Sequence, residues 1–347
     1  MTDFYAGKRV LVTGHTGFKG TWLTKILVNA GAQVLGYSRC SEKSPSLFAL
    51  SGVEGQITHI QGDVRDYPHL YQVFQDFQPE IVFHLAAQPI VRESYQNPLY
   101  TYETNTMGTA NVLEAIRHTP SVSSAVIVTT DKVYKNREWA WGYRENEELD
   151  GFDPYSNSKS CAELVTAAYR RSFPALPPIS TVRAGNVIGG GDFAKDRIIP
   201  DCVRAVSAGE KIVVRNPHSV RPYQHVLEPL SAYLLIARRQ SENPALAGCY
   251  NIGPEDRDCI TTGALVSLFC EKWGEGAGWI DKSEANAPHE AGFLKLDCSR
   301  VKSVFGWRPK WGIEKAVEMA VRFEKHRISA GSAAQEMDWE IQSFQLL

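Results

Sequence analysis

The sequence predicts an α/β protein built on a doubly wound parallel β-sheet, with a smaller and mostly C-terminal second part. Short apolar segments rich in β-branched residues alternate with longer helical segments in the first half of the chain, which is typical of parallel sheets. The first apolar segment, residues 8–13, leads directly into a glycine-rich turn and then into a helical segment. The length of 347 residues exceeds what one small core needs, which indicates two closely joined domains.

The predicted elements follow one another in the order that such a sheet requires. We predict strands at residues 8–13, 32–37, 57–60, within 79–89, and at 124–129, 179–183, 211–215 and 249–253. We predict helices at 21–30, 66–77, 99–119, from 154 onward, at 199–208, in the apolar half of 218–239, at 261–273 and at 311–326. Residues 139–151 and 184–200 are predicted loops, and the tail after residue 327 carries little signal.

Composition and charge narrow the classes of partner. A formal net charge of −2 provides no overall field toward nucleic acid or membrane surfaces. No apolar run approaches the length of a membrane span, and the first residues lack the pattern of a secretory signal. The seven cysteines are scattered without a Cys-x-x-Cys pair, so we expect reduced thiols in a cytoplasmic protein. No His, Cys and Asp spacing predicts a metal site.

A glycine-rich turn between the first strand and the first helix predicts a dinucleotide site. Gly14, Gly17 and Gly20 form a Gly-x-x-Gly-x-x-Gly pattern that lets the backbone approach a pyrophosphate, whose charge the helix N-terminus favours. Phe18 lies in the same turn and is a further candidate contact. His15 is either a contact of the cofactor diphosphate or a tolerated turn residue. A tight turn without a ligand is the weaker alternative in this context.

The other candidate cofactor contacts follow the ends of predicted strands, where open α/β sheets bind ligands. They are Ser38, Arg39, Asp63, Val64, Leu85, Ala86 and Ala87. The small side chains of Ala86 and Ala87 leave room for a cofactor. We favour NAD, although Ser38-Arg39 stands where an acidic residue would mark NAD. Arg39 suits a 2′-phosphate and leaves NADP open, and a solvated surface arginine explains it equally well.

Two short polar motifs predict proton-transfer chemistry. Asp153 is a suitable N-cap for a helix that places Tyr155 and Lys159 on one face, four residues apart. A nearby ammonium lowers the pKa of a tyrosine and makes it a base. The Tyr-x-x-x-Lys pattern alone is weak, because ordinary helix surfaces carry it too. Thr130-Asp131-Lys132 follows the predicted strand 124–129, at an edge of the sheet where ligands bind.

Five motifs follow one another along most of the chain. They are Gly14-x-x-Gly17-x-x-Gly20, HLAAQ at 84–88, TTDKVY at 129–134, Tyr155-x-x-x-Lys159 and RAGNVIGGGD at 183–192. In this order, the chain resembles the extended short-chain dehydrogenases/reductases, and within them the nucleotide-sugar 4,6-dehydratases. The stretch 213–230 and the Asp131-Lys132 pair most resemble the branch of this family that acts on CDP-glucose.

The resemblance implies a fold, a reaction and an assembly. It implies a Rossmann-like dinucleotide-binding domain at residues 1–182, to which the 218–253 region returns, and a nucleotide-sugar-binding part at 183–347. Members of this branch oxidise C4 of CDP-glucose with tightly held NAD, eliminate water across C5 and C6, and return the hydride to C6. The product resembles CDP-4-keto-6-deoxyglucose, a precursor for deoxysugars such as those of O-antigen lipopolysaccharide. The resemblance also implies a homodimer or a homotetramer.

The resemblance further assigns roles to individual residues. Tyr155 with Lys159 supplies the base at O4, Thr130 hydrogen-bonds the same oxygen, and Asp131 matches the acid that protonates the departing hydroxyl. Lys132 departs from the Glu of the dTDP-sugar enzymes, and either acts as a neutral base or stabilises the enolate. The candidate substrate contacts are Gln88, Asn186, Arg197, Arg221 and Asn251. Of these, Asn186 and Arg221 match diphosphate contacts of the family, whereas Arg197 is equally well explained as a surface charge.

Two other functions compete with this interpretation. A UDP-hexose 4-epimerase of the same family uses the same Tyr, Lys and Thr but needs no acid–base pair after the threonine, so Asp131-Lys132 disfavours it. A non-catalytic regulator that senses dinucleotides needs none of these residues, so their presence weighs against it.

Overall fold

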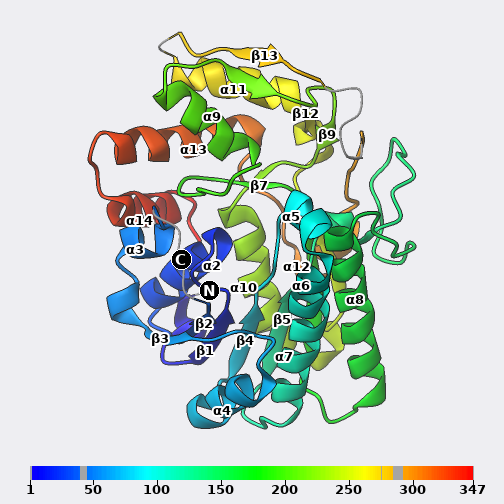
Figure 1. The fold of residues 1–347 in the computed structure, drawn as a ribbon. Coiled ribbons are helices and arrows are strands. Elements are labelled where there is room, and N and C mark those ends of the chain that lie inside the picture. The colour runs from blue at the N-terminus through cyan, green and yellow to red at the C-terminus, as the bar shows by residue number, and fades with distance from the viewer. Residues whose placement is uncertain (1, 40–44, 275, 284–291, 347) are drawn as a thin grey trace.

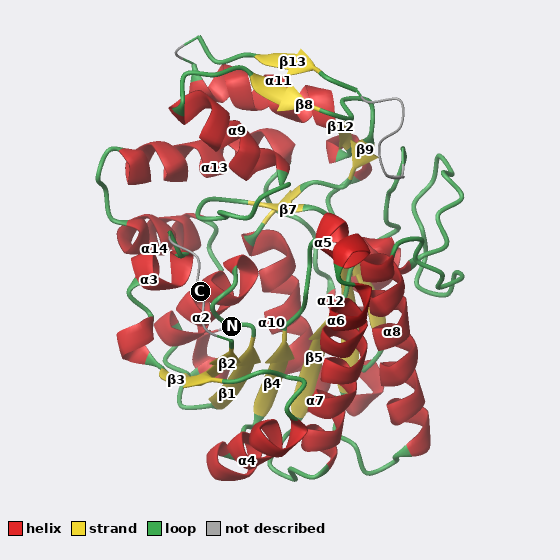
Figure 2. Ribbon diagram, in the orientation of Figure 1, coloured by secondary structure: helices red, strands yellow, loops and turns green. Residues whose placement is uncertain are grey.

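Seven strands form a single parallel sheet in the order β11-β6-β5-β4-β1-β2-β3 (Figures 1 and 2). The computed structural model describes residues 2–39, 45–274, 276–283 and 292–346. The strands are β1 (Arg9–Thr13), β2 (Gln33–Ser38), β3 (Thr58–Gln61), β4 (Ile81–His84), β5 (Ser124–Val128), β6 (Ile179–Ala184) and β11 (Cys249–Ile252). The strand order reverses direction between β1 and β4, and ligands bind doubly wound sheets beyond the carboxyl ends at such a point. The predicted fold class is confirmed.

Helices cover both faces of the sheet. On one face, α2 (Phe18–Asn29) packs on β1 and β2, and α10 (Leu227–Glu242) packs on β5 and β6. Val10, Trp22 and Leu230 share the buried core on this face. The other face is covered by α4 (Tyr67–Phe77), α7 (Gly108–Arg117) and α8 (Pro154–Ser172), where Leu11 and Leu70 belong to a second core. Because both faces are buried, the strands are nearly continuous apolar runs.

A smaller group of elements lies beyond the carboxyl ends of the strands, at the top of Figure 1. It contains α9 (Ile198–Ser207), α11 (Thr262–Trp273), α13 (Ile313–Ile328), and the paired strands β8 (Ile212–Val214) and β13 (Trp279–Asp281). Two further strand pairs join it to the sheet domain, namely β7 (Val187–Ile188) with β10 (Gln224–His225), and β9 (Val220–Arg221) with β12 (Ile260–Thr261). Val203, Phe269 and Val317 belong to its own core. Within the segment 218–253, the chain returns to the sheet domain, because α10 and β11 belong to that domain.

Several short helices were not predicted from the sequence. They are α1 (Thr2–Tyr5), α3 (Leu47–Ser51), α5 (Val91–Gln96), α12 (Ser299–Phe305) and α14 (Ala333–Ser343). The tail after residue 327, which carried little signal in the sequence, contains α14, which begins at the N-cap Ser332 and buries Met337 and Ile341 against the sheet domain. Short helices of this kind depend on tertiary packing more than on local propensity.

The predicted helix at 99–119 is divided into three pieces. α6 (Pro98–Tyr102) leads into a π-helical turn (Glu103–Met107) and then into α7. Asn105 lies in the π-turn, where its side chain accepts from the Gln88 amide at 2.8 Å and donates to the Gln88 carbonyl at 3.0 Å. It also donates to Ser158 Oγ of α8 at 2.9 Å. The extra residue in this turn therefore brings Asn105 to the loop after β4, and π-turns are frequent at functional sites.

The predicted start of the Tyr155 helix is confirmed. Asp153 is the N-cap of α8, and its carboxylate accepts from the Ser156 amide at 3.0 Å, while Pro154 occupies the first helical position. This cap fixes the direction in which Tyr155 and Lys159 enter the protein, and both are buried. No helix in the described ranges has the length and apolar character needed to cross a membrane.

Candidate active site

The glycine turn after β1 has the shape of a ligand cradle. Gly14 has φ +74°, and a Cβ there would lie 2.6 Å from the Ala86 nitrogen, so only glycine fits. A Cβ at Gly20 would lie 2.1 Å from the Gly14 carbonyl oxygen, which lets α2 pack on the turn. Gly17 is exposed, and a Cβ there would meet only the Gly14 carbonyl oxygen at 3.4 Å within 4 Å. Packing therefore does not require a glycine at position 17. The missing side chain leaves space next to the first amides of α2, which lack intrahelical partners.

The strand ends beside this turn contribute small or well-anchored groups. The Ser38 hydroxyl at the end of β2 lies 2.9 Å from Thr16 Oγ1 of the glycine turn. Leu85 and Ala86 are tied to β1 through their amides, which donate to the carbonyl and the hydroxyl oxygen of Thr13 at 3.1 and 3.2 Å. Ala87 follows them and is partly exposed. These groups lie on both sides of the point where the strand order reverses.

Acidic and basic side chains follow the ends of β2 and β3. The Asp63 carboxylate accepts from Arg65 Nε at 3.1 Å and Nη2 at 2.8 Å, and this arginine lowers the pKa of Asp63 against the opposing effect of burial. Val64 is buried, and its carbonyl accepts from Asn111 at 2.8 Å. The Arg39 guanidinium is exposed and lies 5.3 Å from the centre of the Tyr100 ring. Arg39 is thus a surface cation just after β2, with no ion pair among the described residues.

The His15 side chain is directed into the protein. Its Nε2 lies 2.7 Å from His59 Nδ1, and the ring packs on Gly36 of β2, where a Cβ would lie within 2.3 Å of it. Burial and the neighbouring His59 lower the pKa of His15 to about 3, so the ring is neutral. Of the two alternatives for this residue, the structure fits a packed turn residue, and only its backbone faces the cradle.

The turn after β5 places the second motif at the predicted sheet edge. A short 3₁₀ turn (Asp131–Val133) begins at Thr130, whose hydroxyl donates to Asp131 Oδ1 at 2.9 Å. Lys132 Nζ lies 3.0 Å from the same carboxylate oxygen and donates to Asn186 Oδ1 at 3.1 Å. Asp131 is buried, and its Oδ2 has no hydrogen-bond partner among the described residues. One carboxylate oxygen is therefore fixed by its neighbours, and the other is available to a ligand.

Tyr155 and Lys159 enter the same site from α8. Burial raises the pKa of Tyr155 to about 12, against which a hydrogen bond with Thr130 acts in the opposite direction. Burial also lowers the pKa of Lys159 to about 8, and its Nζ donates to the Val128 carbonyl at 3.0 Å. Lys159 contacts the end of β5, and burial keeps Tyr155 protonated at neutral pH. The prediction that a nearby ammonium lowers the pKa of Tyr155 is therefore contradicted, because burial raises it.

Three candidate substrate contacts lie in the loops beyond the sheet. Asn186 joins the catalytic turn through the Lys132 bond described above. Arg197 precedes α9, and its Nη1 lies 3.1 Å from Asp192 Oδ2. Arg221 is buried at the end of β9, where its Nη1 donates to the Val220 carbonyl at 3.1 Å. The pKa of Tyr155 responds to burial, Thr130 and Asp131, and then to the charge of Arg197. Arg197 therefore lies near the catalytic residues.

Gln88 and Asn251 are held by the protein itself. The Asn251 amide donates to the Tyr143 and Asp297 carbonyls at 2.7 and 3.0 Å and accepts from the Tyr134 hydroxyl at 2.6 Å. Gln88 similarly uses its amide for Ile90 and Thr101. Both side chains are buried, and these bonds occupy the groups that a sugar hydroxyl would need. The structure therefore assigns them to shaping the loops around the site.

Lys19 is a cation of the site that the sequence analysis did not single out. It lies in the first turn of α2, between Phe18 and Gly20, and is half-buried. Burial, together with the charges of Arg197 and Lys159, lowers the pKa of Lys19 to about 7. No ion pair joins its ammonium to a carboxylate within the described ranges. The glycine pattern predicts contacts made by the backbone of this turn. The proximity of the Lys19 side chain to the catalytic residues is evident only from the fold.

The fold and these motifs define the class of protein, an extended short-chain dehydrogenase/reductase. The family model described as GDP-mannose 4,6 dehydratase matches residues 11–320, and the chain belongs to this family. The chain is 48% identical over 331 residues to the CDP-glucose 4,6-dehydratase of Salmonella typhimurium strain LT2, covering 93% of this chain and 92% of that protein. The predicted resemblance is confirmed.

Solved structures support the same fold. The dTDP-glucose 4,6-dehydratase of Bacillus anthracis in complex with NAD superposes with a TM-score of 0.79 at 20% identity, covering 94% of this chain and 99% of that one. The UDP-glucose 4-epimerase of Thermotoga maritima with UDP-glucose gives a TM-score of 0.81 at 22% identity, covering 92% and 99%. At these identities the likeness concerns the fold, which dehydratases and epimerases share.

Proposed function

We propose that the protein is a hydro-lyase that converts CDP-glucose to CDP-4-keto-6-deoxyglucose and water with bound NAD. The single observation that carries the proposal is the turn after β5, where Asp131 and Lys132 lie next to Thr130 and share the site with Tyr155. Oxidation of a sugar carbon requires a base and a hydride acceptor, whereas loss of water also requires an acid at the departing oxygen. The similarity to a CDP-glucose 4,6-dehydratase over most of both chains supports the choice of substrate.

The residues around the glycine turn fit a dinucleotide. The strained Gly14 and the open Gly17 form a cradle at the N-terminus of α2, which favours a pyrophosphate. Ser38, Arg39, Asp63 and Val64 would lie along its adenosine half, and Leu85, Ala86 and Ala87 along its other half. When bound, NAD supplies the acceptor of the C4 hydride and its return to C6, together with a positive charge that favours a phenolate.

In the first step, Tyr155 takes the proton of the O4 hydroxyl. Thr130 lies within hydrogen-bonding reach of Tyr155 and is positioned to bond the same sugar oxygen. Lys159 holds its charge close to the site by donating to the end of β5. The burial that raises the pKa of Tyr155 also excludes water, so a charge introduced nearby acts on the phenol with little screening.

In the second step, Asp131 delivers a proton to the C6 oxygen as water departs. Thr130 and Lys132 both bond Oδ1, which leaves Oδ2 as the oxygen that can carry the proton. Lys132 donates to both Asp131 and Asn186, and a side chain held as a donor suits stabilisation of the enolate. In the alternative assignment, a neutral Lys132 takes the proton from C5 while Asp131 protonates the departing hydroxyl.

Several cations would hold the substrate diphosphate. Arg197 and Arg221 carry planar guanidinium groups that bind two oxygens at once, and Asn186 offers an amide beside them. Lys19 adds a fourth group from the glycine turn, within electrostatic range of Arg197. We accordingly assign residues 1–182, together with 218–253, to the dinucleotide and the remainder of 183–347 to the nucleotide sugar.

We also propose a homodimer, formed through α6, the π-turn and α8. Leu99, Met107 and Leu164 on these elements are 71%, 56% and 55% exposed. Large apolar side chains gathered on packed helices are typical of surfaces that a second subunit covers. Light scattering of the wild type and of Leu164→Glu would measure the mass in solution, and a homotetramer would require a second interface.

The test of the proposed function is direct. The purified protein is incubated with CDP-glucose, and the product is analysed by mass spectrometry and by NMR for a 4-keto-6-deoxy sugar. Loss of one water with a methyl group at C6 is the expected result. A C4 epimer of unchanged mass would establish the epimerase instead, and no conversion with NAD bound would favour a sensing protein.

A further inference from the structure

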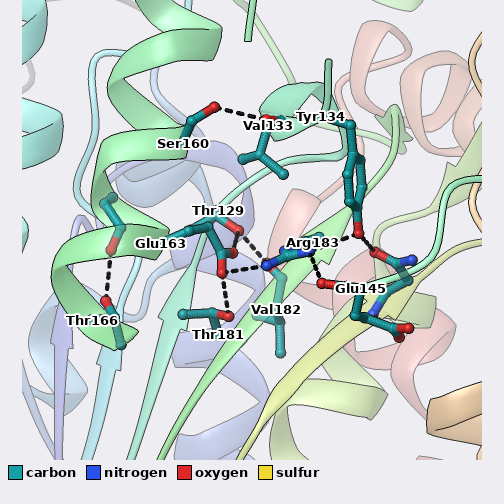
Figure 3. A network of polar contacts seen from close by, with 12 residues as sticks. Thr129, Val133, Tyr134, Glu145, Ser160, Glu163, Thr166, Thr181, Val182 and Arg183 are labelled. Carbon is teal, nitrogen blue, oxygen red and sulfur yellow. Dashed lines mark hydrogen bonds and ion pairs between the residues drawn. The ribbon is translucent and has the colours of Figure 1, made fainter. Parts of the chain in front are cut away.

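A buried ion pair lies beneath the turn that carries Thr130, Asp131 and Lys132. Arg183 of β6 donates from Nη2 to Oε2 of Glu163 on α8 at 2.8 Å, and both side chains are 2% exposed (Figure 3). Burying two charges is expensive, and well-packed apolar side chains often stabilise a fold equally well. The contacts of this pair therefore have to explain why it is present.

The ion pair holds the catalytic turn on both sides. Thr129 directly precedes the turn, and its hydroxyl donates to Glu163 Oε1 at 2.5 Å. Tyr134 directly follows the turn, and its hydroxyl accepts from Arg183 Nη1 at 2.8 Å. Figure 3 shows Thr129 and Tyr134 on opposite sides of the Arg183 guanidinium. The residues on either side of the turn 130–133, Thr129 and Tyr134, are thus both hydrogen-bonded to the same ion pair.

The remaining contacts fix the orientation of the pair. Oε2 of Glu163 also accepts from the Thr181 hydroxyl at 2.7 Å, and Nη1 of Arg183 also donates to the Glu145 carbonyl at 3.0 Å. Ser160, on the same helix as Glu163, donates to the Val133 carbonyl inside the turn at 2.7 Å. A buried network in which nearly every group is bonded is rigid, so the turn has little freedom to move.

The carboxylate also lies on the reacting face of α8. Tyr155, Lys159 and Glu163 are four residues apart in succession and therefore share one side of the helix. Burial lowers the pKa of Lys159 to about 8, and the negative charge of Glu163 acts against this fall. Because Lys159 contributes to the site as an ammonium, the carboxylate extends the pH range over which that charge is present.

We propose that the Glu163–Arg183 pair is a positioning device for the reaction, which fixes both ends of the turn 130–133 and places a carboxylate one helical turn from Lys159. Its kinetic consequences rest on the proposed function, but its effect on Lys159 does not. Glu163 and Arg183 bond protein groups that include Thr129 and Tyr134, so the pair acts through the turn and not on the reacting atoms.

The test compares two variants with a matched control. Glu163→Gln keeps an oxygen for Thr129 but removes the charge. Glu163→Gln combined with Arg183→Met removes both charges and covers the case in which an unpaired Arg183 prevents folding. The control is Glu340→Gln, another fully buried carboxylate, which pairs with His225 on the far side of the sheet domain.

Two measurements are made on each folded protein. The first is an NMR titration of protein labelled with ¹³C at lysine Cε, in which the Lys159 signal is identified by its loss in Lys159→Met. The second is the pH dependence of kcat and KM with CDP-glucose. Circular dichroism establishes that each variant is folded before either measurement.

Both Glu163 variants should titrate Lys159 at a lower pH than the wild type, and the alkaline limb of kcat/KM should move with it. In Glu163→Gln, kcat should fall about 10²-fold with KM nearly unchanged, as a small misplacement of catalytic groups produces. An unchanged Lys159 midpoint, or an equal shift in Glu340→Gln, would overturn the inference. If the wild type does not convert CDP-glucose, the proposed function fails, while the titration still decides the role of the pair.

Discussion

Asp131→Asn should separate oxidation of the sugar from loss of water. Thr130 and Lys132 both bond Oδ1 of Asp131, and an asparagine oxygen can accept the same two bonds. The amide nitrogen then occupies the position of the unpartnered Oδ2, where it cannot transfer a proton to a departing hydroxyl. The geometry of the turn is retained, and only the acid is lost. Oxidation at C4 depends on Tyr155 and should continue.

The expected loss follows from the usual contribution of a general acid. A positioned acid accelerates a step by about 10²–10⁴-fold, which corresponds to about 3–5 kcal/mol of barrier. A single-turnover experiment with CDP-glucose follows bound NADH by absorbance and the 4-keto-6-deoxy product by mass. Wild type should show transient NADH, whereas in Asp131→Asn the NADH should persist while the product lags. Formation of the deoxy product at the wild-type rate would show that the acid is another residue.

Four further outcomes are expected. Tyr155→Phe removes the proton acceptor and should slow formation of bound NADH by at least about 10²–10⁴-fold, so full activity in this variant would contradict the proposed base. Gly14→Ala should lose bound NAD, measured as nucleotide released on denaturation, because its φ of +74° and the backbone 2.6 Å from its Cβ position forbid alanine; Gly55→Ala, which meets nothing within 4 Å, is the control and should retain NAD. Arg221→Ala should weaken CDP-glucose binding by about 2–5 kcal/mol while NAD content stays constant, and unchanged binding would remove it from the diphosphate site. Burial lowers the pKa of Lys159 from 10.5 to about 8, so the unfolded chain binds more protons between these values, and the free energy of unfolding should rise with pH across this window. Urea unfolding of Lys159→Met should lack that part of the rise.

The sheet and the position of the reacting residues could be predicted because local signals determined them. Strand periodicity, the glycine turn and the Asp153 cap act over a few residues, and the fold confirmed each of them. The carboxyl-end rule placed Thr130 and its neighbours at the edge of the sheet where ligands bind, and the family resemblance brought them together with Tyr155. The order of the strands was not predicted, because it depends on pairing between distant segments.

The missed features depend on contacts between distant parts of the chain. Asn251 follows the sheet edge in sequence, but its amide is occupied by carbonyls from two other loops, which no local pattern reveals. His15 lies in the glycine turn, but the absence of a side chain at Gly36 draws its ring inward. The π-turn at Glu103–Met107 arises from bonds between Asn105, Gln88 and Ser158. Each outcome depends on a partner more than ten residues away.

The distribution of charge explains how a protein without a strong overall charge can select a charged substrate. The chain has a formal net charge of −2, so no long-range field gathers anions. Arg197, Lys159 and Lys132 nevertheless all lie within electrostatic range of Lys19, and so does Asp131. Burial and the repulsion from these cations lower the pKa of Lys19 to about 7. Keeping Lys19 charged beside them is therefore energetically unfavourable. A diphosphate would relieve that repulsion on binding, whereas a neutral sugar would not. The same cations would stabilise an enolate at O4, so the groups that select the substrate also favour the elimination.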